Sequence, residues 1–170
     1  MSVLWQQTAQ KAAALSKKYK TNDPFAIAEA LGVTVRYSED FKQLKGMYTV
    51  IARNRFIFLN ANNGEQLNRI VCAHELGHDR LHREFAKEGP MQELMLFDFS
   101  SKMELEANLF AAELLLSDKE VLFHVASGRD LEEIAKLTET DPNLVALKLR
   151  SLSMKGYALR EQLYENKFLK

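Results

Sequence analysis

Residues 74–78 read His74-Glu75-Leu76-Gly77-His78, and histidines four positions apart share one face of an α-helix. At this spacing their Cβ atoms lie about 5–6 Å apart, and zinc–nitrogen bonds are about 2.0–2.1 Å long, so both imidazoles can bind one ion. Glu75 lies about a quarter of a turn further round the helix, where its carboxylate can hydrogen-bond a metal-bound water. The stretch therefore predicts a helical zinc centre in which Glu75 acts as a general base.

The sequence around this motif favours a helix with one apolar side. Apolar or small residues recur at helical spacing, at Ile70, Val71, Ala73, Leu76, Gly77 and Leu81. Residues 62–64, Asn-Asn-Gly, supply turn and capping residues before it. Histidines on an apolar side need partners, because an unpaired buried polar group costs roughly 1–3 kcal/mol. A metal ion is the simplest partner, although carboxylates or carbonyl groups would also serve.

Two small residues of this helix add to the prediction. Gly77 costs up to about 1 kcal/mol relative to alanine in a helix, which fits close approach by another backbone to the metal face. The alternative is a glycine that is tolerated without a purpose. Cys72 is the only cysteine, and it lies two residues before His74, on nearly the opposite side of the helix. We therefore expect it to pack as a small apolar residue. Because no intrachain disulfide can form, we expect a cytoplasmic protein.

A third ligand is expected from residues 101–116, which read as an amphipathic helix. Two glutamates compete for this role. Glu104 shares a helical face with Asn108, whereas Glu106 shares one with Glu113, so we expect Glu104 to point inward. The sequence thus favours Glu104 as the carboxylate ligand.

Two neighbours of Glu104 bear on this assignment. Ser101 stands three residues before it, so the pair also fits a capping box, in which the glutamate hydrogen-bonds the first amide of the helix and binds no metal. Asn108 lies one turn beyond Glu104 and is placed to hydrogen-bond the free nitrogen of a ligating histidine. The alternative for Asn108 is an ordinary polar helix residue.

Two motifs occur in order along the chain: His-Glu-Leu-Gly-His at 74–78 with Leu81-His82, then Glu104-x-x-Ala107-Asn108-x-Phe110-Ala111-Ala112-x-Leu114-Leu115. Together they resemble the ImmA/IrrE family of metallo-endopeptidases, over a region from about Asp23 to about Leu152. One departure is visible, because the family often has a proline after the Leu-Leu pair, where this chain reads Leu116-Ser117-Asp118. That difference concerns a helix end and no chemistry.

The resemblance implies a gluzincin-like site in which His74, His78 and Glu104 bind Zn²⁺ and Glu75 activates water. It also implies an endopeptidase whose protein substrate is a helix-turn-helix repressor, of a mobile element or a stress-response circuit. An oxyanion donor is normally required as well. Tyr48, Tyr157 and His124 are all chemically able to serve, and the sequence does not choose among them.

The remaining histidines are not expected to bind the ion. His82 follows His74 by about 12 Å of helix rise, too far for one tetrahedral centre, so we expect a helix-end residue or a residue that contacts a ligand. His124 lies between apolar residues and is expected to be a histidine of the core or of its boundary.

The chain has 170 residues, of which 46% are hydrophobic and 27% charged, enough for one sizeable core. Lysine plus arginine and aspartate plus glutamate both number 23, so the formal charge of +0 gives no overall attraction to nucleic acid or acidic membranes. No apolar run reaches the length of about 18 residues that a membrane span needs, and the N-terminus does not read as a signal peptide. We therefore expect no membrane association.

The predicted fold class is α+β: mostly helical, with a small three-stranded sheet packed beside the helix of the His-Glu motif, as in zincins. Helices are predicted at residues 3–20 and 24–31, strands at 33–37, 46–51 and 55–59 with a hairpin turn at Arg53-Asn54, and helices throughout after Asn62. Strand 46–51 or 55–59 is a candidate edge for pairing with extended substrate, unless both are fully paired. We expect a single domain, 1–170, with an N-terminal helix (1–22), a zincin-like core (23–127), a helical pair (128–155) and a C-terminal tail (156–170).

A second function class comes from residues 130–150, where two short helices joined by Thr138–Asp141 have the outline of a helix-turn-helix. Its basic residues are able to contact phosphate, at Lys148, Arg150 and Lys155. Its acidic residues would repel phosphate, at Glu132, Glu133, Glu139 and Asp141. The pair is therefore expected to complete the core or hold a protein substrate. The alternative is a non-catalytic, zinc-stabilised regulator that binds DNA or protein. Oligomeric state is left open.

Overall fold

The computed structural model describes residues 3–93, 97 and 101–159. The elements in chain order are α1 (Val3–Tyr19), α2 (Pro24–Ala30), β1 (Val33–Ser38), β2 (Gly46–Ile51), β3 (Asn54–Asn60), α3 (Glu65–Leu81), the 3-10 helix η1 (Phe85–Lys87), β4 (Met91–Glu93), α4 (Lys102–Leu115), α5 (Asp118–Ala126), α6 (Leu131–Leu137) and α7 (Pro142–Met154). The α+β class is confirmed. Most of the predicted C-terminal tail, residues 160–170, lies outside the described residues.

The sheet has the strand order β1-β3-β2-β4, with β1 parallel to β3 and the other two pairs antiparallel. The three predicted strands are confirmed, but a fourth, β4, was not expected. It lies in the region predicted to be wholly helical and pairs with residues 46–48 of β2. A three-residue strand is too short to show an alternating sequence pattern. Its extended form comes from pairing with a distant strand.

Two local expectations about the sheet are corrected. The hairpin turn lies one residue earlier than predicted, at Ala52 and Arg53, which have φ of 48° and 67°. Positive φ at both central residues is the conformation of a type I′ turn. Strand β3 lies between β1 and β2, so residues 55–59 are not an edge, and β4 covers part of β2.

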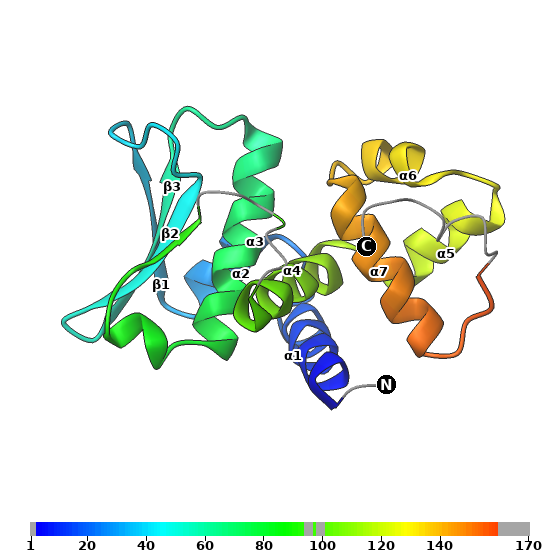
Figure 1. Cartoon of the computed structure of the whole chain (residues 1–170), viewed down its shortest axis with the longest axis horizontal. Helices are drawn as coiled ribbons and strands as arrows, with labels where there is room; N and C mark the ends of the chain where they lie inside the picture. Colours follow the sequence, from blue (N-terminus) through cyan, green and yellow to red (C-terminus); the bar gives the residue numbers. More distant parts are fainter. Residues whose placement is uncertain (1–2, 94–96, 98–100, 160–170) are drawn as a thin grey trace.

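Helix α3 carries the His-Glu motif and packs against the sheet (Figure 1). Its apolar side contributes the fully buried Val71 and Leu76, which join Tyr48, Ile57 and Leu59 of the sheet in one core. The helix begins after Gly64, whose N-cap position makes no side-chain hydrogen bond, so the predicted asparagine cap is absent. The sheet and α3 thus hold the motif on a rigid surface.

Helix α4 connects the two ends of the molecule. It packs against α3, α1 and α7, and Figure 1 shows α5, α6 and α7 gathered at the end away from the sheet. The predicted pair of helices, α6 and α7, is confirmed, with Asp141 capping α7 by accepting a hydrogen bond from Asn143 N–H.

The basic residues considered for phosphate contact all have partners within the protein, although only Lys148 is buried. Lys148 is buried and its Nζ lies 2.8 Å from Glu113 Oε2, while Lys155 donates to the same oxygen at 3.2 Å. The Arg150 guanidinium lies 5.0 Å from the centre of the Trp5 ring. All three cations thus already interact with other side chains of the chain.

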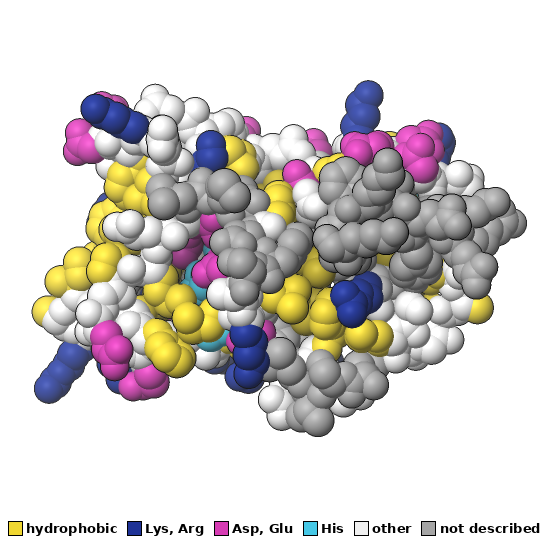
Figure 2. Space-filling view, in the orientation of Figure 1, with side chains coloured by type: hydrophobic (Ala, Val, Ile, Leu, Met, Phe, Trp, Pro, Cys, Tyr) yellow, Lys and Arg dark blue, Asp and Glu magenta, His cyan; other side chains and the backbone are white. Residues whose placement is uncertain are grey.

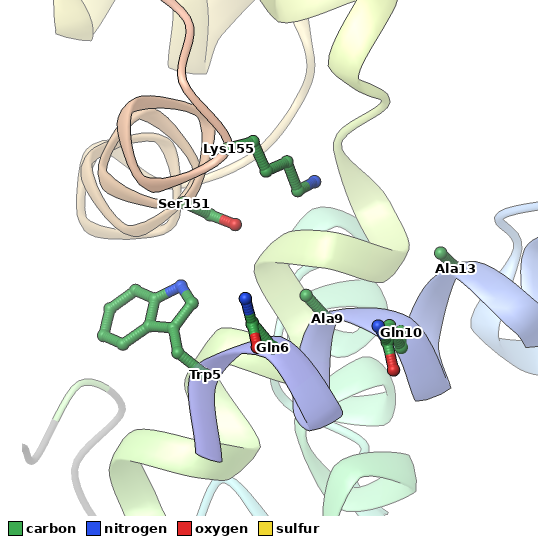
Figure 3. A pocket seen from close by; sticks show the side chains of 7 residues that line it. All are labelled: Trp5, Gln6, Ala9, Gln10, Ala13, Ser151 and Lys155. Atoms are coloured by element: carbon green, nitrogen blue, oxygen red, sulfur yellow. The ribbon is translucent and has the colours of Figure 1, made fainter. Parts of the chain in front are cut away.

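A small pocket of about 240 Å³ lies where α1 meets α7. Figure 3 shows Trp5 and Gln6 of α1 on one side, with Ser151 and Lys155 on the other. Among the described residues, no helix is long and apolar enough to span a membrane.

Candidate metal centre

Three predicted ligands converge where α3 meets the first turn of α4. His74 Nε2 and His78 Nε2 are 3.0 Å apart, and Glu104 Oε2 lies 3.2 Å from His74 Nε2. Glu104 Oε1 lies 3.6 Å from His78 Nε2. Ligands at the corners of a zinc tetrahedron are separated by about 3.3 Å, given metal–ligand bonds near 2.0–2.1 Å. These residues therefore fit one metal ion, and their ligand atoms all lie within 4.8 Å of one another.

The orientation of the two imidazoles also fits a metal. Asn108 Oδ1 lies 2.9 Å from His74 Nδ1, which confirms the contact predicted for Asn108. His78 Nδ1 likewise faces away, toward His82 Nδ1 at 3.0 Å. Both histidines thus point their Nε2 atoms at the centre. Metal-bound histidines are commonly held in this way through the other ring nitrogen.

Glu75 lies beside the centre in a fully buried position. Neither of its carboxylate oxygens has a partner at ordinary hydrogen-bond geometry. The backbone N–H of Tyr48 is close enough to lower the pKa of Glu75, but this is the smallest of the influences on it. Burial raises the pKa of Glu75 to about 8, and the neighbouring charges of Glu93 and Glu104 add to the increase, while His74 opposes it. A buried carboxylate without a partner requires an explanation, and a polar group bound at the centre would provide one.

The charges around the centre favour a cation. Burial alone would lower the pKa of His74, but the adjacent Glu104 and Glu93 outweigh it and raise the pKa to about 10. Burial lowers the pKa of His78 to about 4, so this imidazole is neutral and able to bind metal. Burial opposes ionisation of Glu104, but the two histidines hold its pKa below its ordinary value. The carboxylates of Glu93 and Glu104 beside His74 thus favour a positive charge at this place, which a metal ion would supply.

Comparison with known proteins gives the family. Residues 28–150 match the peptidase family described as the IrrE N-terminal-like domain. The chain belongs to this family. It is also 37% identical over 134 residues to "Uncharacterized immunity region protein 2" of Bacillus phage phi105, and the match covers 79% of this chain and 84% of that protein. The predicted resemblance to ImmA/IrrE proteins is confirmed. The matching model is that of a peptidase family.

Two glutamates of α4, Glu104 and Glu106, were candidates for the third ligand, and the directions of their side chains distinguish them in this IrrE-like domain. Ser101 Oγ accepts a hydrogen bond from the backbone N–H of Glu104 at 3.1 Å, as an N-cap does. The Glu104 carboxylate, however, faces the two histidines, so the capping-box alternative does not describe it.

Glu106 corrects the expectation that only Glu104 turns inward. It is more buried than Glu104, and its Oε2 lies 2.8 Å from His82 Nε2. The reason lies in α4, which is buried from Glu106 to Leu115 because α1, α3 and α7 all pack on it. A prediction based on one inward face fails for a helix that is enclosed on several sides.

One acidic residue of the centre was missed by the sequence reading. Glu93, at the end of β4, is buried with its Oε2 2.8 Å from His74 Nε2. The strand that carries it was not predicted, and an isolated glutamate gives no signal of its own. The backbone of β2 is close by as well, since a Cβ on Gly46 would stand 3.2 Å from Glu75 Oε1.

The structure also tests a candidate oxyanion donor. The Tyr48 hydroxyl is buried and donates to Asp79 Oδ1 at 2.8 Å, so it is not free to face a substrate, and that candidate is wrong. His124 lies on α5 and Tyr157 follows α7, so both belong to the end of the molecule away from the sheet. Figure 2 shows small areas of histidine surface among acidic and hydrophobic side chains, in the part of this face where α3 and α4 lie beside the sheet.

Proposed function

We propose that this chain is a zinc-dependent endopeptidase, in which His74, His78 and Glu104 hold the metal and Glu75 is the general base. One observation carries the proposal. Three ligand atoms of suitable types meet at tetrahedral spacing, directly beside a buried carboxylate whose oxygens lack hydrogen-bond partners. Membership of a peptidase family supports the same conclusion.

The residues of the chain divide the work of peptide hydrolysis. Zinc, when bound, makes water more acidic and polarises the scissile carbonyl. Glu75 accepts a proton from the attacking water at its carboxylate and returns it to the leaving amine. Asn108 keeps the Nε2 atom of His74 directed at the centre.

We further propose a cytoplasmic protein whose substrate is a helix-turn-helix repressor. The support is the family resemblance and the printed name of the phage relative, which describes that protein as part of an immunity region. The α6–α7 pair, whose basic residues already have partners within the chain, is proposed to hold a protein rather than nucleic acid.

The test is incubation of the zinc-loaded wild type and Glu75→Gln with candidate repressors encoded near its gene, followed by intact-mass measurement. We expect fragments from the wild type and none from Glu75→Gln, because the amide cannot accept the proton. Zinc content, measured by elemental analysis, should be equal in the two proteins, since Glu75 is not a ligand. Equal cleavage by both proteins would refute the assignment of the base.

The same variants separate the alternative of a zinc-stabilised regulator. Such a protein would keep its DNA or protein binding in Glu75→Gln and would cleave nothing. DNA binding would also weaken steeply with salt, because it depends on contacts to phosphate.

A further inference from the structure

We propose that His82 and Glu106 are positioning residues that strengthen metal binding by fixing the ring orientation and tautomer of His78. This inference rests on the zinc centre proposed above. Neither residue is placed to bind the ion: His82 is the C-cap of α3, and the Glu106 carboxylate faces His82. Both act through His78 instead.

The contacts form a continuous chain from the centre. His78 points Nε2 at the ligand cluster and Nδ1 at His82 Nδ1, 3.0 Å away. His82 Nε2 then lies 2.8 Å from Glu106 Oε2. All three side chains are buried or nearly so.

Only one placement of protons satisfies this chain when His78 Nε2 faces a metal. The Nδ1 atom of His78 must carry the proton and donate it to the Nδ1 lone pair of His82. His82 then carries its own proton on Nε2 and donates it to the carboxylate of Glu106. The carboxylate therefore fixes the tautomer of His82, which in turn fixes that of His78.

The chain of contacts also connects the two helices that supply the ligands. His82 and His78 belong to the end of α3, and Glu106 lies two residues after Glu104 on α4. Asn108 makes the equivalent connection for His74 in a single step. Each ligating imidazole is thus held through Nδ1 by a residue of α4, directly in one case and through His82 in the other.

The test is the zinc affinity of the whole chain, measured by competition with a chromophoric chelator. We expect His82→Ala and Glu106→Ala each to weaken zinc binding about 10–100-fold, the usual loss when such a partner is removed. The double variant should bind zinc no more weakly than whichever single variant has the lower zinc affinity, because either change breaks the same chain of contacts. Glu106→Gln retains an acceptor oxygen and should lose less. Glu88→Gln removes the same charge from an exposed position and should match the wild type.

A second measurement separates positioning from general packing. In the metal-free wild type, ¹⁵N chemical shifts of His78 should report the proton on Nδ1, and in Glu106→Ala they should report a mixture of tautomers. Unchanged tautomers, unchanged affinity, or losses that add in the double variant would each overturn the inference while the zinc centre stands. A wild type that binds no zinc at all would overturn the proposed function and this inference together.

Discussion

Gly77 of α3 lies directly against Ala107 of α4: a Cβ atom at position 77 would stand 3.0 Å from the Ala107 Cα and 3.2 Å from its carbonyl oxygen. Both neighbours are backbone atoms, which cannot rotate away as a side chain does. The absence of a side chain therefore allows the two helices to approach closely. That approach brings Glu104, one turn before Ala107, within reach of His74 and His78.

The first prediction is that Gly77→Ala lowers both stability and zinc affinity. Alanine gains about 1 kcal/mol of helix propensity, but overpacking a tight contact costs typically 1–3 kcal/mol, so we expect a net loss of about 1 kcal/mol in the free energy of unfolding. Urea denaturation of the metal-free protein measures this loss. Gly89→Ala is the matched control, because a Cβ there meets nothing within 4 Å. A Gly77→Ala protein that is more stable than wild type would contradict the close contact.

The sequence was sufficient for features that depend on local spacing. Helical spacing places the two histidines on one face, and it places Asn108 near them. The start of α2 follows from local residue preferences, with Asp23 as the N-cap and Pro24 after it. Glu104 could be preferred to Glu106 as a ligand because it shares a helical face with Asn108. For Gly77 the sequence left two interpretations open, and the contact with Ala107 supports the one that has a close backbone.

The features that were missed depend on partners far away in the chain. Strand β4 exists through its pairing with β2, more than 40 residues earlier, and Glu93 reaches His74 only because of that pairing. The contact between Glu106 and His82 forms because other helices pack around α4 on several sides. The sequence pattern of one helix does not show this packing. The hydroxyl of Tyr48 was considered for catalysis because its partner, Asp79, was not visible from the sequence.

The second prediction concerns Tyr48→Phe. The hydroxyl donates to Asp79 Oδ1, which also accepts from Arg55, so removing it takes one hydrogen bond from a buried carboxylate. We expect a loss of about 1–3 kcal/mol in the free energy of unfolding. Cleavage by the folded, zinc-loaded variant should stay within a few-fold of the wild type. A collapse of kcat with normal zinc content would instead restore Tyr48 as an oxyanion donor.

The third prediction concerns the buried pair Lys148 and Glu113, which joins α7 to α4. Lys148→Met leaves the buried Glu113 carboxylate, and the less buried Asp118 carboxylate, with one remaining partner, Lys155, and should cost about 3 kcal/mol. Replacing both residues, as Lys148→Met with Glu113→Leu, should recover most of that loss, because no unpaired charge remains. Thermal and urea unfolding of the two single variants and the double variant measure the coupling. Additive losses would show that the pair is not coupled.

The fourth prediction is that zinc raises the melting temperature. A ligand that binds only the folded state at 100 times its Kd stabilises that state by about 2.7 kcal/mol. A chelator should therefore lower the Tm of the wild type and leave Glu104→Ala unaffected, since that variant lacks a ligand. Glu120→Ala, which removes an exposed acid of α5, should respond to the chelator as the wild type does. Equal chelator effects in Glu104→Ala and the wild type would place the zinc elsewhere.

The fifth prediction concerns the acid side of stability, through Asp118 at the start of α5. Burial alone would raise the pKa of Asp118, but Lys148 and then Lys155 outweigh it and hold the pKa below its ordinary value. A carboxyl whose pKa is lower in the folded state contributes stability above its unfolded pKa, near 3.9, and loses it as the pH falls through the folded value. The difference in unfolding free energy between wild type and Asp118→Asn should therefore be constant from pH 7 to about pH 5 and shrink below about pH 4. Urea denaturation at several pH values measures it, and a difference that stays constant down to pH 3 would mean that the two lysines do not hold this carboxylate in its ionised form.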